Sequence, residues 1–86
     1  MGDQIIRDKR NRRICAIKTD LLGNQTIYDP MNRKMAVIKI DSAGRQVLYD
    51  TMNKKKTYYD PKLNLTKDMS NRTIGKGNIL LDLVLN

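Results

Sequence analysis

The sequence predicts an all-β protein, one domain over residues 1–86 built as an antiparallel meander of short β-hairpins. Two observations favour this fold. A motif with Asp, then Asn three residues later, then a basic residue occurs four times, and strand-length segments rich in Ile, Val, Tyr and Thr separate its copies. No segment has the length and 3.6-residue apolar period of a helix without an interrupting Asp, Pro or Gly. We expect about four pseudo-repeats, near 6–26, 27–47, 48–66 and 67–86, in a closed or layered small domain.

The motif aspartates mark turns. They are spaced 21, 21 and 18 residues apart, and a second series with Gly at the fourth position begins at Asp20 and Asp41. Asp suits the first position of a type I turn, and Asn or Gly at the fourth tolerates the left-handed backbone that the following bulge needs. Seven of the nine acidic residues are therefore assigned to turns: Asp8, Asp20, Asp29, Asp41, Asp50, Asp60 and Asp68.

Seven stretches between the turns have the composition of strands, and long and short stretches alternate. They span 12–19, 24–28, 33–40, 45–49, 54–59, 64–67 and 78–85. The last of these is rich in Leu and is also compatible with a helical turn, so both interpretations stay open.

In the first two copies, both faces of the long strand are apolar at its centre. Cys15 and Ala36 occupy the same repeat position on one face, next to Ala16 and Val37 on the other. A strand buried on both faces packs between layers, around a barrel or against another copy of the chain. Since so short a chain can build only a small core, we expect the protein to form a homo-oligomer.

Composition limits the chemistry. The 86 residues include 17 Lys and Arg against nine acids, a net charge of +8, with one Cys and no His. A catalytic Cys–His pair, an internal disulfide and a cysteine-only zinc site are therefore excluded. We expect no catalytic residue, no metal site and no cofactor, and we interpret Cys15 as a core residue. No apolar run has the length of a signal peptide or a membrane span, so we expect a cytoplasmic protein.

Basic residues follow the turn asparagines and form the one recurring polar feature with functional potential. If the repeats surround an axis, these side chains would form a row that contacts phosphates of nucleic acid or another polyanion. The alternative is that they are solvated residues that protect strand edges from aggregation. The candidate anion-binding residues are Arg10, Arg12, Arg13, Arg33, Lys34, Lys54, Lys55 and Arg72.

The Tyr-Asp-x-x-Asn copies at Tyr28 and Tyr49, with Asp-x-x-Gly turns between motifs, resemble two groups of hairpin repeats. The chain is similar to the bacterial four-fold β-flower proteins, small domains of four hairpin petals and unknown function. It resembles less closely the Tyr-Asp repeats of Rhs-type toxins, where Gly is usual at the position that Asn holds here. The resemblance covers residues 6–78, implies a hairpin-repeat fold, and supplies no catalytic residues.

Three hypotheses about function follow. The first is a non-enzymatic β-repeat module for protein interaction or assembly that associates with itself. The second is a non-specific binder of nucleic acid or another polyanion that uses the basic row. The third, which size and charge permit without indicating it, is a small inhibitor or accessory protein of a mobile element.

Overall fold

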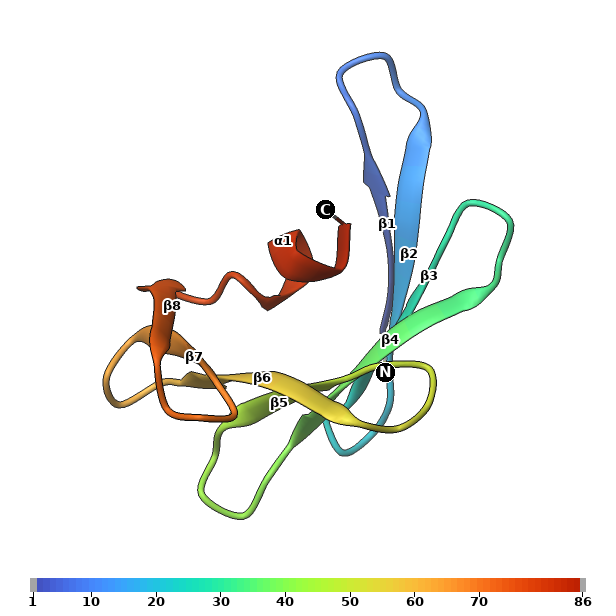
Figure 1. Ribbon diagram of the computed structural model, residues 1–86. Coiled ribbons are helices and arrows are strands. Elements are labelled where there is room, and N and C mark those ends of the chain that lie inside the picture. Colours follow the sequence, from blue (N-terminus) through green and yellow to red (C-terminus); the bar gives the residue numbers. More distant parts are fainter. Residues whose placement is uncertain (1, 86) are drawn as a thin grey trace.

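The computed structural model describes residues 2–85, and within this range the chain forms eight strands and then one short helix. Each strand pairs antiparallel with the next, so the sheet order is the sequence order. This confirms the predicted all-β meander of hairpins (Figure 1). The elements are β1 (Gly2–Arg7), β2 (Arg13–Thr19), β3 (Gln25–Tyr28), β4 (Lys34–Ile40), β5 (Gln46–Tyr49), β6 (Lys55–Asp60), β7 (Leu65–Asp68), β8 (Thr73–Lys76) and α1 (Leu80–Leu85).

The turns have the geometry that the sequence predicts. At Asp29, the backbone carbonyl accepts the N–H of Asn32 at 2.9 Å, and the Asp29 N–H donates to the carbonyl of Arg33 at 2.8 Å. Asn32 has a φ of 66°, in the left-handed region that Asn tolerates better than most residues. The same conformation recurs at the fourth position of five other turns, with positive φ at Asn11, Asn53, Asn71, Gly23 and Gly44, whereas in the turn that begins at Asp60 it falls on Asn64 at the fifth position.

A register shift lies next to each Asn turn, in the strand pair that the turn connects, and makes the sheet coil. A bulge adds local twist to a pair of strands, so four bulges at one repeat position turn the hairpins progressively around the domain. Figure 1 shows the result, in which the hairpins fan outward like petals. The shifts fall between Ile6 and Arg7, Ile27 and Tyr28, Leu48 and Tyr49, and Thr66 and Lys67.

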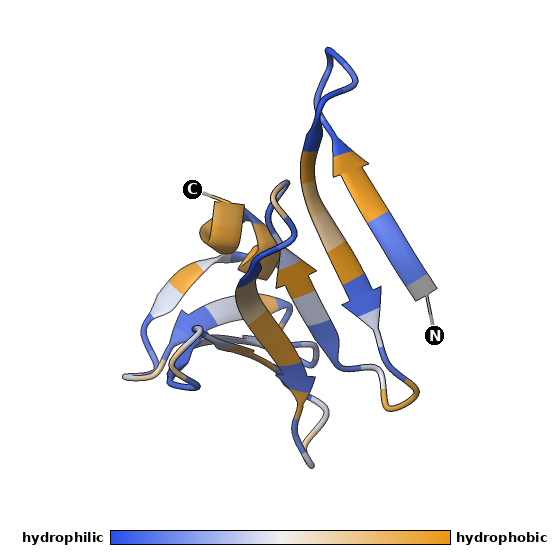
Figure 2. Ribbon diagram, turned by 90° about the vertical axis from the view of Figure 1, so that its right-hand side faces the viewer, coloured by the Kyte–Doolittle hydropathy of each residue, from blue (hydrophilic) through white to orange (hydrophobic). Residues whose placement is uncertain are grey.

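The main buried cluster lies on one face of the sheet, which we call the inner face, while Ala16, Val47 and Tyr58 are buried on the opposite, outer face. On the inner face, buried side chains of β2 to β5 pack with Leu80 of α1, which is fully buried. Figure 2 shows α1 as an apolar element beside the apolar parts of the strands. The buried cluster consists of Cys15, Ile17, Ile27, Ala36, Ile38, Leu48 and Leu80.

The sheet is open, so of the two predicted arrangements the layered one applies, with α1 as a second layer on the inner face. Among residues 2–85, β1 and β8 each pair with a single neighbour. No helix in this range is both long and apolar enough to span a membrane.

The C-terminal stretch forms a helix, so the strand interpretation of 78–85 is wrong. The Asn78 side-chain oxygen accepts the N–H of Leu80 at 3.2 Å and caps the first turn. Leu81, Val84 and Leu85 then pack against the core cluster, whereas Asp82 is exposed. This spacing of apolar residues belongs to one face of a helix.

Two strands were not predicted. β1 precedes the first turn, and β8 contains Gly75, which usually weakens a strand. The structure explains the glycine, because a Cβ on Gly75 would lie 2.8 Å from Cδ1 of Ile79. Gly75 therefore lets the chain leading into α1 pack closely on β8.

Candidate anion-binding surface

Three of the predicted anion-binding arginines form ion pairs with the aspartate of their own turn. In the second Asn turn, Asp29 Oδ1 accepts the backbone N–H of Arg33 at 2.8 Å and Oδ2 accepts its Nε–H at 3.1 Å. The pairs Arg12–Asp8 and Arg72–Asp68 repeat this arrangement, each with an Nε–Oδ2 distance of 3.0 Å. These arginines therefore brace the turns, although their guanidinium groups remain largely exposed.

The same hydrogen bonds lower the pKa of the turn aspartates. For Asp8, Asp29 and Asp68, the backbone N–H of the residue four positions later is the largest cause of the lowered pKa, and the arginine side chain adds to it. The pKa of Asp50 is lowered in the same way by the backbone of Lys54, with a further contribution from Lys56. Ionised carboxylates accept hydrogen bonds best, so the fold favours the charged form of these groups.

Lys54 occupies the equivalent position in the third Asn turn, but only its backbone takes part in the turn. Its N–H donates to Asp50 Oδ1 at 2.9 Å, and the carboxylate faces Lys56 Nζ at 3.5 Å. Arg10 lies inside the first turn, where its N–H donates to Asp8 Oδ1 at 2.9 Å. The side chains of Arg10 and Lys54 are exposed to solvent.

The remaining predicted residues begin the long strands. Arg13 pairs with Arg7 across β1 and β2, an arrangement of like charges. Lys34 and Lys55 lie opposite Tyr28 and Tyr49 in their respective strand pairs. All three side chains are exposed, and they lie at the end of the strands next to the Asn turns.

The basic residues share one end of the strands but do not converge on one flat surface. In a meander, successive turns alternate between the two ends, so the four Asn turns lie at the same end. Figure 1 shows these turns, after β1, β3, β5 and β7, pointing outward in different directions. The structure therefore presents the predicted basic residues as separate groups, one on each hairpin.

A second set of cations lies on the outer face, and the sequence reasoning missed it. Lys18 Nζ lies 5.2 Å from the centre of the Tyr28 ring, and Lys39 Nζ lies 5.1 Å from the centre of the Tyr49 ring. Arg45 completes the set above the ring of Tyr58, at 5.0 Å. Such contacts hold a cation over the negative face of an aromatic ring.

The signal for these pairs was present in the sequence. Lys18 and Lys39 are 21 residues apart, as are Tyr28 and Tyr49. Each lysine stands ten residues after a motif Asp, Lys18 after Asp8 and Lys39 after Asp29. Adjacent long and short strands bring the lysine of one beside the tyrosine of the next, which only the strand register reveals.

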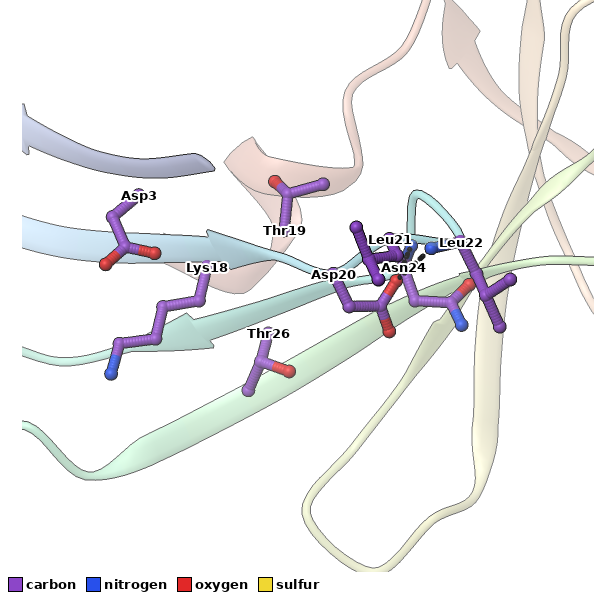
Figure 3. Close-up of a pocket in the computed structure, with 8 residues that line it drawn as sticks. All are labelled: Asp3, Lys18, Thr19, Asp20, Leu21, Leu22, Asn24 and Thr26. Carbon is purple, nitrogen blue, oxygen red and sulfur yellow. Dashed lines mark hydrogen bonds between the residues drawn. The ribbon is translucent and has the colours of Figure 1, made fainter. Parts of the chain in front are cut away.

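A hollow of about 540 Å³ lies beside the first Gly turn (Figure 3). Lys18 lines it together with two carboxylates, those of Asp3 and Asp20. Asp20 Oδ1 accepts the backbone N–H groups of Leu22 and Asn24, at 2.9 and 3.0 Å, so this carboxylate also organises its own turn. With two acids to one base, the interior of this hollow does not suit a small anion, whereas Lys18 Nζ extends over the Tyr28 ring on the outer face.

The cysteine lies in the core, away from these surfaces. Cys15 has no exposed surface, and burial raises the pKa of its thiol while the charge of Arg13 acts in the opposite direction. Residues 2–85 contain no group of three or more His, Cys, Asp or Glu side chains placed to hold a metal ion.

Comparisons with protein-family models, with curated proteins and with solved structures give no match.

Proposed function

We propose that the protein is a non-enzymatic β-repeat assembly module that associates with itself through β1. The observation that carries the proposal is the open sheet, in which β1 pairs only with β2 among residues 2–85. Such an edge offers unpaired backbone N–H and C=O groups to a further strand. At six residues, β1 is also a longer edge than the four-residue β8.

The sequence of β1 is complementary to itself in one antiparallel register. When Ile5 lies opposite Ile5 of a second copy, Asp3 lies opposite the partner's Arg7, and Arg7 opposite the partner's Asp3. These three residues share the outer face, because Ile6 between them packs against the core on the inner face. Opposite charges and apolar pairs directly across two strands are both stabilising, at about 0.2–1 kcal/mol for each pair.

Exposure of the central residue supports the same register. Ile5 is 49% exposed and lies between Asp3 and Arg7 on the outer face of the strand. Pairing across a two-fold axis would cover it with the identical side chain of the partner. A two-fold dimer is also the commonest oligomer of soluble proteins, since one patch serves both subunits.

Sedimentation velocity over a range of protein concentrations tests the assembly. We expect a dimer at high concentration and dissociation on dilution, together with slower hydrogen exchange of the β1 amides in the dimer. A monomer at all concentrations, or a dimer with unchanged exchange in β1, would contradict the proposal.

A second candidate function, polyanion binding, rests on the cations of the outer face. The turn carboxylates are engaged by their own turns, so the excess of positive charge is left to side chains such as Lys18 and Lys39. Lysines over tyrosine rings combine charge for phosphates with aromatic surface, as in proteins that bind single-stranded nucleic acid. Titration of a fluorescent single-stranded oligonucleotide at two salt concentrations tests this function, and no binding at low salt would contradict it.

A further inference from the structure

A polar pocket on the outer face differs from the surfaces described above. It has a volume of about 250 Å³ and lies where the second Gly turn, β5, β6 and the last Asn turn meet. Two cations and one carboxylate line it, with two tyrosines and one amide. These residues are Arg45, Lys55, Asp41, Tyr49, Tyr58 and Asn71.

Arg45 is held from two sides in this pocket. Its Nε donates to Asp41 Oδ2 at 2.8 Å, and its guanidinium lies over the ring of Tyr58. The side chain of Arg45 is 44% exposed, compared with 78% for Arg33 in the corresponding ion pair of an Asn turn. A guanidinium fixed in this way loses less conformational entropy when it binds an anion.

The carboxylate in the pocket already accepts three hydrogen bonds from its own turn. Asp41 Oδ1 accepts the backbone N–H groups of Ala43 and Arg45, at 3.0 and 2.9 Å, and Oδ2 accepts the Arg45 Nε–H. The terminal Nη groups of Arg45 form no hydrogen bond to another group of residues 2–85. These donors are therefore free for a ligand, while the negative charge of Asp41 is directed into the turn.

Lys55 and Asn71 add donors from two other elements. Lys55 is exposed, and its Nζ has no ion pair within residues 2–85. The hydroxyl of Tyr58 donates to Asn71 Oδ1, which leaves the Asn71 amide nitrogen as a donor at the same pocket. Asn71 belongs to the last Asn turn, which follows the shortened interval of 18 residues between Asp50 and Asp68.

The corresponding place in the preceding repeat lacks these features. Asn24 stands 21 residues before Arg45, and Val37 stands 21 residues before Tyr58. Asn24 lines the hollow of Figure 3, where its side-chain oxygen accepts the N–H of Ile40 at 3.1 Å. The fixed arginine over an aromatic ring is therefore specific to the second Gly turn and does not follow from the repeat.

We propose that this pocket binds a phosphate monoester, with the phosphoryl oxygens on Arg45 and Lys55 and the ester group against Tyr49. Arg45 and Lys55 supply two cationic donor groups for the phosphoryl oxygens, and the planar fork of Arg suits these oxygens. The volume is below the range of about 300–1,000 Å³ that is usual for drug-sized ligands, so the ester group is small. This inference does not depend on dimer formation, and it narrows polyanion binding to one discrete site.

Titration of the ¹⁵N-labelled protein with phenyl phosphate, followed by NMR, tests the proposal. We expect saturable shifts of the amides of Arg45, Lys55 and Asn71, a weaker effect of inorganic phosphate, and the weakest effect of benzoate, which has a single charge. Equal shifts with benzoate, or shifts spread over all the basic hairpins, would overturn it.

Two arginine variants form a matched pair. Arg45→Gln should weaken phenyl phosphate binding by about tenfold or more, because a charged hydrogen-bond donor is lost. Arg33→Gln removes an equivalent ion pair at a turn outside the pocket and should leave the affinity unchanged. If both variants weaken binding equally, the interaction is diffuse and the pocket proposal fails.

A third variant, Lys55→Gln, changes an exposed side chain without a structural partner, so it should weaken binding without disturbing the fold. It therefore tests the pocket even if Arg45→Gln disturbs folding. Oligonucleotide binding measured on the same variants separates the two proposals. A pocket that fails to bind phenyl phosphate while salt-dependent oligonucleotide binding persists would contradict this inference alone.

Discussion

Asp29 accepts both the backbone N–H and the Nε–H of Arg33, at 2.8 and 3.1 Å, so one carboxylate closes a turn and neutralises the cation that follows it. The arrangement recurs at Asp8, Asp41 and Asp68. In this protein the acidic residues are chiefly structural. The positive charge at the surface comes from the lysines and from the exposed Nη groups of the arginines.

The first prediction concerns acid. The pKa values of Asp8, Asp29, Asp41, Asp50 and Asp68 are lowered in the folded protein from an ordinary value of 3.8. A lowered pKa contributes stability that is complete above the unfolded pKa and is lost as pH falls through the folded pKa. Urea denaturation should therefore show a free energy of unfolding that decreases below about pH 4.

Asp29→Asn provides the control for this pH dependence. The variant should be less stable than the wild type at neutral pH, and its free energy of unfolding should depend less on pH between 4 and 2. An unchanged acid dependence would mean that the turn carboxylates do not carry the effect.

The second prediction concerns the left-handed turn position. Asn53 has a φ of 64°, which strains any residue with a Cβ and strains Asn less than most. Asn53→Ala should lower the free energy of unfolding by about 1 kcal/mol in chemical denaturation, whereas Asn53→Gly should change it much less. Equal effects of Ala and Gly would show that the backbone conformation is not the cause.

The third prediction concerns the contact between the helix and the sheet. Leu80 is fully buried in the core cluster, so Leu80→Ala should lower the free energy of unfolding by about 2–5 kcal/mol. Leu21, 83% exposed at a turn, is the matched control, and Leu21→Ala should have little effect. If Leu80→Ala is equally mild in urea denaturation, α1 does not cover the inner face.

The fourth prediction concerns the cations of the outer face. Replacing Lys18 and Lys39 together with Gln should weaken oligonucleotide binding and reduce its dependence on salt, by about 0.7 in the log–log slope for each lost phosphate contact. The exposed turn lysines Lys9 and Lys62, changed together, serve as the control. Fluorescence anisotropy at several salt concentrations measures both slopes, and identical slopes for the two double variants would contradict a role for the outer face.

The turns could be predicted from the sequence because their chemistry is local. An aspartate that accepts the N–H groups two and four residues later needs only its own five-residue segment, as at Asp50. The positive φ of Asn53 follows from the same short segment. The positions of the turns fix where the strands begin and end, so most strands of the meander can be predicted from the turns.

The ends of the fold were harder to predict. β1 precedes the first Asp, although Gln4 stands 21 residues before Gln25 and continues the repeat. α1 is only six residues long, too short for its apolar spacing to be distinguished from that of a buried strand. Its helical form depends on packing against β2 to β5 and on the cap from Asn78, and the packing is tertiary.

The predicted anion-binding residues were identified by repeat position, which fixes the end of the sheet but not the direction of each hairpin. Bulges determine that direction, and their cumulative twist separates Arg12, Arg33 and Lys54 in space. The pocket at Arg45 could not be derived from the repeat, because it depends on a turn contributed by the irregular last interval.

The charge-swapped dimer provides the most direct test of self-association through β1. In the proposed register, Asp3 faces the partner's Arg7, so Asp3→Arg should convert the dimer to a monomer, and adding Arg7→Asp to the same chain should restore it. Sedimentation velocity of the wild type, the single variant and the double variant measures this. Monomer with the single change and dimer with both is the predicted result, whereas a dimer that survives Asp3→Arg unchanged would contradict assembly through this edge.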